Sequence, residues 1–214
     1  IIVPYTLWKA YGDTRIIERH WESMTRFMAW RKQCAPEGQG IKHPDANTWG
    51  DWLNMNEATP IEFIDAAYYK WDAGLMAQMA GAIGRKEEAA QYYQLQSQIS
   101  RRFVADFSDP NNLLKVDTQT AYALAIAFGL RSSLTSQTLA ARLAEKIAQN
   151  EFRMATGFLG TKPLLPALSA SGQHDLAVRL LQSRKFPSWG FEVENGATTI
   201  WERWDSFTKE HGFN

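Results

Sequence analysis

The sequence of 214 residues lacks several features that characterise particular classes of protein. Its single cysteine, Cys34, cannot form a disulfide within the chain, so a disulfide-stabilised scaffold is excluded. It has no net charge, because 23 Lys and Arg residues balance 23 Asp and Glu residues. Surfaces that bind nucleic acid or anionic membranes need an excess of basic residues. We therefore expect neither kind of partner.

Long apolar runs and the common cofactor motifs are also missing. No stretch of about 18 uncharged apolar residues occurs, so no transmembrane helix is expected. The four histidines show no paired spacing, and the chain has neither a glycine-rich phosphate loop nor a Gly-x-Ser-x-Gly motif. The sequence therefore predicts no metal site and no cofactor.

What the sequence has in quantity is tryptophan, with nine residues, and helical periodicity. Apolar residues recur at spacings of three and four in residues 14–34, 61–83, 86–107 and 133–149. This pattern predicts helices with one apolar face. Residues 121–128 are apolar on every side, which is typical of a helix that is covered all round. About eight helices are expected in the whole chain.

The connections between these helices alternate in length. Four of them are short, and each contains a glycine where a helix C-cap needs a left-handed backbone: Gly12, Gly84, Gly129 and Gly172. The others are long, and they cover residues 35–60, 108–117, 150–162 and 184–198. If successive helices are antiparallel, the short turns lie at one end and the long loops at the other.

This alternation predicts an all-α toroid of repeated αα-hairpins, with buried helices inside and amphipathic helices outside. A plain α-solenoid would contain the same helices, but it does not explain why one end alone has long, tryptophan-rich loops. Binding residues concentrate on loops that a rigid scaffold holds in place, so we expect a site at that end.

The first long loop contains Asp51 between two tryptophans, Trp49 and Trp52. This arrangement suits a sugar, because an indole stacks on the apolar side of a pyranose while a carboxylate accepts hydrogen bonds from its hydroxyls. The alternative is structural: both tryptophans pin the loop to the core and Asp51 caps a turn. The sequence does not decide between them.

The last long loop leads into a segment that contains Glu202. Thr198 and Thr199 are good N-cap residues, so Glu202 is expected in the first turn of a following helix, where the helix dipole favours an ionised carboxylate. An ionised carboxylate at a cavity mouth is the form that a general base requires. The alternative is a capping box, because Thr199 and Glu202 have its spacing. For residues 117–120 and 156–161, helix capping is favoured over lining a cavity.

Four stretches of this sequence resemble a known family, the inverting bacterial and fungal α-L-rhamnosidases of glycoside hydrolase family 78. They are residues 49–53, 119–125, 156–161 and 187–206, and they extend over essentially the whole chain in the right order. The resemblance implies an (α/α)6 barrel, a six-hairpin toroid that agrees with the alternation of connections. It also implies hydrolysis of terminal α-L-rhamnose with inversion at the anomeric carbon.

The resemblance also implies roles for individual residues. Glu202 matches the general base of the family, and Trp52 matches a tryptophan that lines the rhamnose subsite. Asp51 lies beside it, and the remaining tryptophans expected in the sugar subsite are Trp49, Trp189 and Trp201. The expected partner is a rhamnose-containing glycoside or oligosaccharide.

The sequence departs from the family pattern at both ends. The segment that carries the general acid of the family is not found in residues 1–47, and the chain stops before the stretch that supplies a substrate-binding histidine. Six hairpins require roughly twelve helices, against about eight here. We therefore expect residues 1–214 to be part of one (α/α)6 catalytic domain that begins at Ile1 inside a barrel wall. Such a piece would need the other barrel segments as partners and would be inactive alone.

Two alternatives remain open. One is a non-catalytic carbohydrate-binding or scaffold fragment with the same fold. The other is an α/α-barrel glycosidase that acts on a different sugar.

Overall fold

The structure is a computed structural model that describes residues 1–41, 49–111, 113–130 and 133–213. The chain forms two compact units. The first unit comprises Ile1–Thr48 and Ile61–Asn112, and the second comprises Trp49–Pro60 and Leu113–Asn214. None of the described helices has both the length and the apolar character needed to cross a lipid bilayer.

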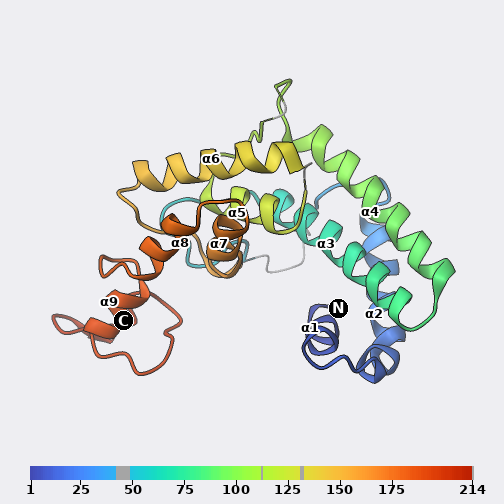
Figure 1. Ribbon diagram of the computed structural model, residues 1–214, viewed down its shortest axis with the longest axis horizontal. Helices are drawn as coiled ribbons and strands as arrows, with labels where there is room; N and C mark the ends of the chain where they lie inside the picture. The colour runs from blue at the N-terminus through green and yellow to red at the C-terminus, as the bar shows by residue number, and fades with distance from the viewer. Residues whose placement is uncertain (42–48, 112, 131–132, 214) are drawn as a thin grey trace. The chain divides into compact units, whose positions relative to one another are not determined.

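The described part of the first unit contains four helices (Figure 1): α1 (Ile2–Tyr11), α2 (Arg15–Cys34), α3 (Ile61–Ala82) and α4 (Lys86–Phe107). Helix α3 is the buried one, and it packs along α4 while also contacting α1 and α2. A Cβ atom on Gly74 of α3 would lie 2.2 Å from Nε2 of Gln96, so the end of this α4 side chain packs directly on the Gly74 backbone. Phe63 packs edge to face on Phe103 at 5.0 Å between ring centroids.

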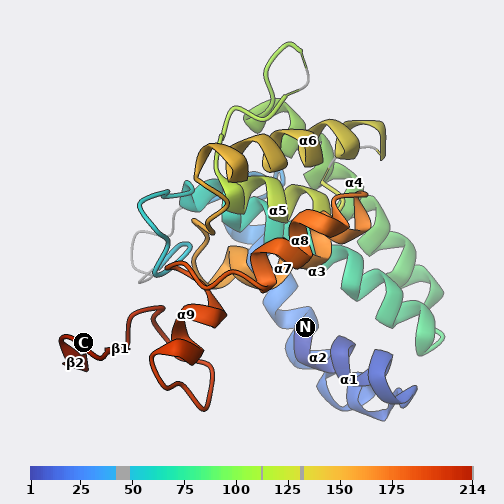
Figure 2. The same ribbon diagram turned by 60° about the vertical axis from the view of Figure 1, so that its left-hand side comes forward.

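The second unit contains α5 (Gln119–Ala127), α6 (Ser133–Gln149), α7 (Phe158–Ala170), α8 (His174–Leu181) and α9 (Trp189–Glu194). Helix α5 is buried from Gln119 to Ala125 and packs on both α6 and α7, while α7 also packs on α8 (Figure 2). Helix α6 contributes one buried face, formed by Leu139, Leu143 and Ile147. The unit ends in an antiparallel hairpin of β1 (Phe207–Thr208) and β2 (Gly212–Phe213).

The five helices predicted with bounds are confirmed, and their ends differ from the prediction by at most two residues. Helix α7 begins at Phe158, inside the long connection that was predicted over residues 150–162. The four predicted C-cap glycines have left-handed backbones, with φ of 71° at Gly12, 77° at Gly84, 58° at Gly129 and 81° at Gly172. The predicted caps include Thr118, whose side chain accepts a hydrogen bond from the backbone N–H of Ala121 at 3.0 Å.

The helix expected after Thr199 is absent, and this prediction was wrong. Glu202 lies in a non-helical segment, and the helix of this region is α9, which falls within the expected loop. The reason is Ser188, whose Oγ accepts a hydrogen bond from the backbone N–H of Phe191 at 3.0 Å and so starts α9. Helix α9 stops before Gly196, which has φ of 95°. The capping-box interpretation of Thr199 and Glu202 is excluded for the same reason.

Candidate functional site

A buried aspartate joins three chain segments of the second unit. Asp51 is only 2% exposed, and its Oδ1 accepts hydrogen bonds from the backbone N–H groups of Leu159 (2.8 Å) and Gly160 (2.9 Å). Its Oδ2 accepts one from the N–H of Gly157 at 2.7 Å and another from the hydroxyl of Thr120. The loop that follows Trp49 is thereby attached to the beginnings of α5 and α7.

The glycines around Asp51 are required by close packing. A Cβ atom on Gly157 would lie 2.3 Å from the carbonyl oxygen of Trp52. A Cβ atom on Gly160 would lie 2.2 Å from Oγ1 of Thr120. Real Cβ atoms do not approach other heavy atoms this closely. A larger residue at Gly157 would therefore displace the loop that carries Asp51, and one at Gly160 would displace Thr120 of α5.

A second set of hydrogen bonds brings the long connections of this unit together. The side chain of Gln119 accepts a hydrogen bond from the backbone N–H of Ala155 at 2.9 Å and donates one to the carbonyl of Arg153 at 3.0 Å. The backbone N–H of Gln119 donates to Glu57 at 2.6 Å, and the backbone N–H of Met55 donates to the carbonyl of Ala155 at 3.0 Å. The loops around residues 49–60, 113–118 and 150–157 therefore form one connected assembly.

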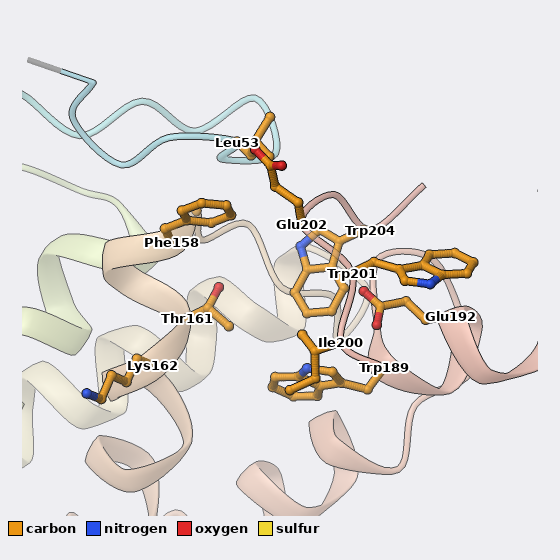
Figure 3. Close-up of a pocket in the computed structure, with 11 residues that line it drawn as sticks. Leu53, Phe158, Thr161, Lys162, Trp189, Glu192, Ile200, Trp201, Glu202 and Trp204 are labelled. Atoms are coloured by element: carbon orange, nitrogen blue, oxygen red, sulfur yellow. The ribbon is translucent and has the colours of Figure 1, made fainter. Parts of the chain in front are cut away.

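A cavity of about 270 Å³ lies beside this assembly (Figure 3). Its walls come from the first long loop, the first two turns of α7, helix α9 and the segment that follows α9. The lining residues are Leu53, Gly157, Phe158, Thr161, Lys162, Trp189, Glu192, Ile200, Trp201, Glu202 and Trp204.

Three tryptophans give the cavity its aromatic character. Trp189 and Trp204 pack edge to face, with ring centroids 5.4 Å apart and an interplanar angle of 76°. Trp201 lines the cavity from the same segment as Trp204. Indole faces next to carboxylates suit a ligand that has apolar C–H faces and hydroxyl groups, as a sugar has.

The two carboxylates of the cavity are in different environments. Glu202 is exposed, and Figure 3 shows its side chain extending toward Leu53. Glu192 is 3% exposed, and burial raises the pKa of its carboxyl, while a hydrogen bond from the backbone of Trp201 acts in the opposite direction. The cavity therefore presents one carboxylate that is open to water and one that is desolvated.

The structure brings together three of the residues predicted from the sequence: Glu202, Trp189 and Trp201. Asp51 does not line the cavity, and its oxygens already accept four hydrogen bonds, which favours its structural alternative over direct contact with a sugar. Trp49 and Trp52 do not line the cavity either. They pack edge to face on each other at 4.7 Å and remain 62% and 42% exposed, so they are not pinned into the core.

Several lining residues escaped the sequence interpretation, above all Glu192. Trp189 and Glu192 are three residues apart in α9 and therefore lie on one helix face. This signal was present in the sequence, but it appears only when Ser188 is taken as an N-cap. The expectation that residues 156–161 cap a helix rather than line a cavity was also wrong: Phe158 and Thr161 line the cavity, and the N-cap of α7, Gly157, makes no side-chain capping hydrogen bond.

Among the described residues, no group of three or more His, Cys, Asp or Glu side chains has an arrangement that would hold a metal ion.

Comparison with known proteins places this site in context. The model of the bacterial α-L-rhamnosidase six-hairpin glycosidase domain matches residues 1–214. An α-L-rhamnosidase of Streptomyces avermitilis is 37% identical over 213 residues, which cover 100% of this chain and 20% of the relative. An α-L-rhamnosidase of Formosa agariphila is 35% identical over 221 residues, covering 100% of this chain and 23% of the relative.

The fold of this chain is also similar to that of α-L-rhamnosidases of known structure. The crystal structure of the Streptomyces avermitilis α-L-rhamnosidase complexed with L-rhamnose matches 99% of this chain and 20% of its own, with a TM-score of 0.91 and 36% identity. The α-L-rhamnosidase of Aspergillus terreus matches 99% of this chain and 25% of its own, with a TM-score of 0.86 and 27% identity. The chain thus spans about a fifth to a quarter of these relatives. The expected six-hairpin class is confirmed, and the chain belongs to the bacterial α-L-rhamnosidase six-hairpin glycosidase family.

Proposed function

We propose that this chain forms the general-base side of the active site of an inverting α-L-rhamnosidase, with Glu202 as the base. The observation that carries the proposal is an exposed carboxylate on the wall of a cavity that three tryptophans also line. The similarity to a rhamnosidase solved with L-rhamnose supports the choice of sugar. In this proposal the substrate is a glycoside with a terminal, non-reducing α-L-rhamnose.

The chemistry requires two carboxyl groups on opposite faces of the sugar. Glu202 removes a proton from the water that attacks the anomeric carbon, and a carboxylic acid outside this chain protonates the departing glycosidic oxygen. In inverting enzymes such groups stand about 6.5–9.5 Å apart, which leaves room for the water. An exposed position suits Glu202, because the base must be ionised before the reaction and must reach a water molecule.

The tryptophans have separate roles in this proposal. Trp189 and Trp201 form part of the sugar subsite, since both line the cavity with Glu202. Trp52 precedes Leu53, which lines the cavity, so the exposed Trp49–Trp52 pair provides a further stacking surface for the glycoside on this loop. Asp51 acts indirectly, by fixing the loop that carries that pair.

The test is Glu202→Gln in the natural polypeptide that carries these residues, assayed on an aryl α-L-rhamnoside. We expect kcat to fall by about 10²- to 10⁴-fold, because a general base contributes on this scale. The melting temperature should stay unchanged, since Glu202 is exposed. A matched control is Glu210→Gln, another exposed carboxylate of the same unit that does not line the cavity.

Near-normal turnover by the Glu202→Gln variant would rule out the assignment of the base. Proton NMR of the first product formed by the wild type tests the stereochemistry, because inversion must release β-L-rhamnose. If the wild type binds L-rhamnose but does not hydrolyse the glycoside, the non-catalytic carbohydrate-binding alternative is correct instead.

A further inference from the structure

Helix α9 has an inverted pattern of burial. Glu192 is only 3% exposed, whereas Val193, the next residue, is 67% exposed. A helix that packed only for stability would bury the valine and leave the glutamate in water, because a carboxylate is almost never fully buried unless it is paired. The burial of Glu192 is thus unfavourable in itself, and the proposed chemistry of Glu202 does not account for it.

This inversion does not come from a loosely placed helix. Ser188 accepts a hydrogen bond from the backbone N–H of Phe191 at 3.0 Å, and Phe191 packs edge to face on Phe186 at 5.2 Å between ring centroids. A Cβ atom on Gly190 would lie 2.3 Å from a backbone carbonyl oxygen of the preceding chain. These contacts fix which face of α9 carries Glu192 inward.

The inward face of α9 is turned to the cavity. Trp189 and Glu192 are three residues apart in the helix, so they lie on one face, and both line the cavity. Figure 3 shows the carboxylate of Glu192 pointing away from α9, on the side where the rings of Trp189 and Trp204 lie. Glu192 is therefore hidden from bulk water but placed where a bound ligand would meet it.

The protein supplies few hydrogen-bond donors to this carboxylate. Among the described residues, no Lys or Arg forms an ion pair with Glu192, and no side chain donates a hydrogen bond to it. Asp51, by contrast, accepts four hydrogen bonds within the second unit. A carboxylate has about four lone-pair sites. A ligand that donates hydrogen bonds to the open sites of Glu192 would offset the cost of burying its charge.

The cavity wall defines the chemistry of such a ligand. It must donate hydrogen bonds to Glu192, and it must present apolar C–H faces to the tryptophans that line the same cavity. The hydroxyl groups of a sugar ring meet the first condition, and the C–H faces of the ring meet the second. Two neighbouring hydroxyls can each donate to one oxygen of the same carboxylate.

From this arrangement we propose that Glu192 is a specificity-determining residue, whose carboxylate accepts hydrogen bonds from ring hydroxyl groups of the terminal rhamnose. The inference rests on the proposed function, because it takes the cavity as the rhamnose subsite. A site built to bond a hydroxyl rejects an analogue without it, since the buried acceptor is then left unpaired. Replacement of Glu192 should therefore weaken sugar binding and remove the preference for the hydroxyl that it bonds.

The experiment measures kcat/KM of the natural polypeptide and of Glu192→Ala on an aryl α-L-rhamnoside and on its monodeoxy analogues, which lack the hydroxyl at C2, C3 or C4. We expect Glu192→Ala to lower kcat/KM on the parent rhamnoside by about 10- to 100-fold, the value of a hydrogen bond to a charged group. On an analogue that lacks a bonded hydroxyl, the same substitution should have a clearly smaller effect. Comparing both proteins on one analogue cancels the intrinsic reactivity of that analogue.

Glu194→Ala is the matched control, because Glu194 lies on the same helix but is half-exposed and pairs with Arg184 at 2.9 Å. It should leave kcat/KM unchanged on all four substrates. A loss in Glu192→Ala that is equal on all four substrates would overturn the proposal, because Glu192 would then act without bonding a ring hydroxyl. Wild-type kcat/KM in Glu192→Ala would overturn it as well. If Glu192→Ala does not fold, Glu192→Met fills a similar space with a poor acceptor, and the same outcomes decide.

Calorimetric titration with L-rhamnose provides a readout that does not depend on turnover. Glu192→Ala should raise the Kd for L-rhamnose by about 10- to 100-fold, and Glu194→Ala should not change it. If the wild type binds L-rhamnose but hydrolyses no rhamnoside, the proposed function fails, while a raised Kd in Glu192→Ala still supports the hydroxyl contact. If Glu202→Gln abolishes turnover and Glu192→Ala leaves both Kd and kcat/KM unchanged, only the contact proposed for Glu192 fails.

Discussion

Each of the two units contains an aspartate with at least one buried carboxylate oxygen, and the two aspartates differ in their hydrogen bonding. Asp51 of the second unit accepts three backbone N–H groups and a hydroxyl. Asp72 of the first unit has an Oδ1 atom that is buried without a hydrogen-bond partner among the described residues. Burial raises the pKa of Asp72 to about 6, although the positive charge of Arg31 acts in the opposite direction.

Asp51 and Asp72 differ because only the first turn of a helix has backbone N–H groups without a partner in the helix. Asp51 meets the start of α7, whose first N–H groups have no partner within the helix. Asp72 lies in the interior of α3, where each backbone N–H is already bonded to the preceding turn. The comparison shows that burial of a carboxylate oxygen does not by itself provide it with hydrogen-bond partners, and that nearby free donors are needed.

The largest expected effect is that of Asp51→Asn. Each oxygen of Asp51 accepts two hydrogen bonds, and at least one of each two comes from a backbone N–H, so either orientation of an amide places its NH2 group against a backbone donor. We expect a loss of about 3–5 kcal/mol in the free energy of unfolding, as for a broken buried charge network. Denaturant unfolding followed by circular dichroism measures it.

Asp13→Asn is the control for this change, because Asp13 lies at the surface and pairs with Arg15 at 2.6 Å. Surface pairs of this kind contribute little to stability. If Asp51→Asn were as harmless as Asp13→Asn, the donors around Asp51 would not be what stabilises it.

The same substitution at Asp72 should have the opposite sign. Because its pKa is about 6 in the folded protein, against 3.8 for an unperturbed aspartate, the protonated form is favoured by folding. That stability is fully present below pH 3.8 and is lost as the pH rises through 6. Asp72→Asn keeps the neutral form at every pH, so at pH 7 it should stabilise the protein by up to about 3 kcal/mol.

The pH dependence separates this explanation from a general packing effect. The stabilisation by Asp72→Asn should disappear below pH 4, where the wild-type carboxyl is itself protonated. Melting temperatures at pH 4 and pH 7 give both values. A gain of equal size at both pH values would show that ionisation of Asp72 is not its cause.

The smallest expected effect concerns Ser188, which accepts one N–H at the start of α9, where Asp51 accepts three at the start of α7. Ser188→Ala should cost about 1 kcal/mol, the usual value of an N-cap. Amide exchange within α9 measures the loss. A cost as large as that of Asp51→Asn would mean that the number of donors does not govern the effect.

Sequence periodicity predicts the long helices well because it is a local property. The bounds of α4 and α6 follow from apolar spacing within each segment alone, and the turn at Gly84 follows from one residue type. Family resemblance, not periodicity, gives Glu202 its expected role. Apolar periodicity does not identify the residues of the cavity wall, because they come from separate segments of the chain.

The N-cap Ser188 and the buried Asp51 show why the sequence does not predict this wall. Ser188 and Thr199 are both acceptable N-caps, and only the packing of the surrounding chain selects Ser188. The backbone donors to Asp51 lie 106 to 109 residues away in the sequence, so nothing near Asp51 indicates that they will meet it. Contacts between distant segments decide whether a carboxylate faces a ligand or the core.

The edge-to-face pair of Trp189 and Trp204 has a spectroscopic consequence. Two indoles with centroids 5.4 Å apart are close enough for their electronic transitions to couple, which makes their near-ultraviolet circular dichroism sensitive to their mutual orientation. Both rings line the cavity. The protein therefore carries its own optical reporter at the place where a ligand would enter, and no attached dye is needed to follow its occupancy.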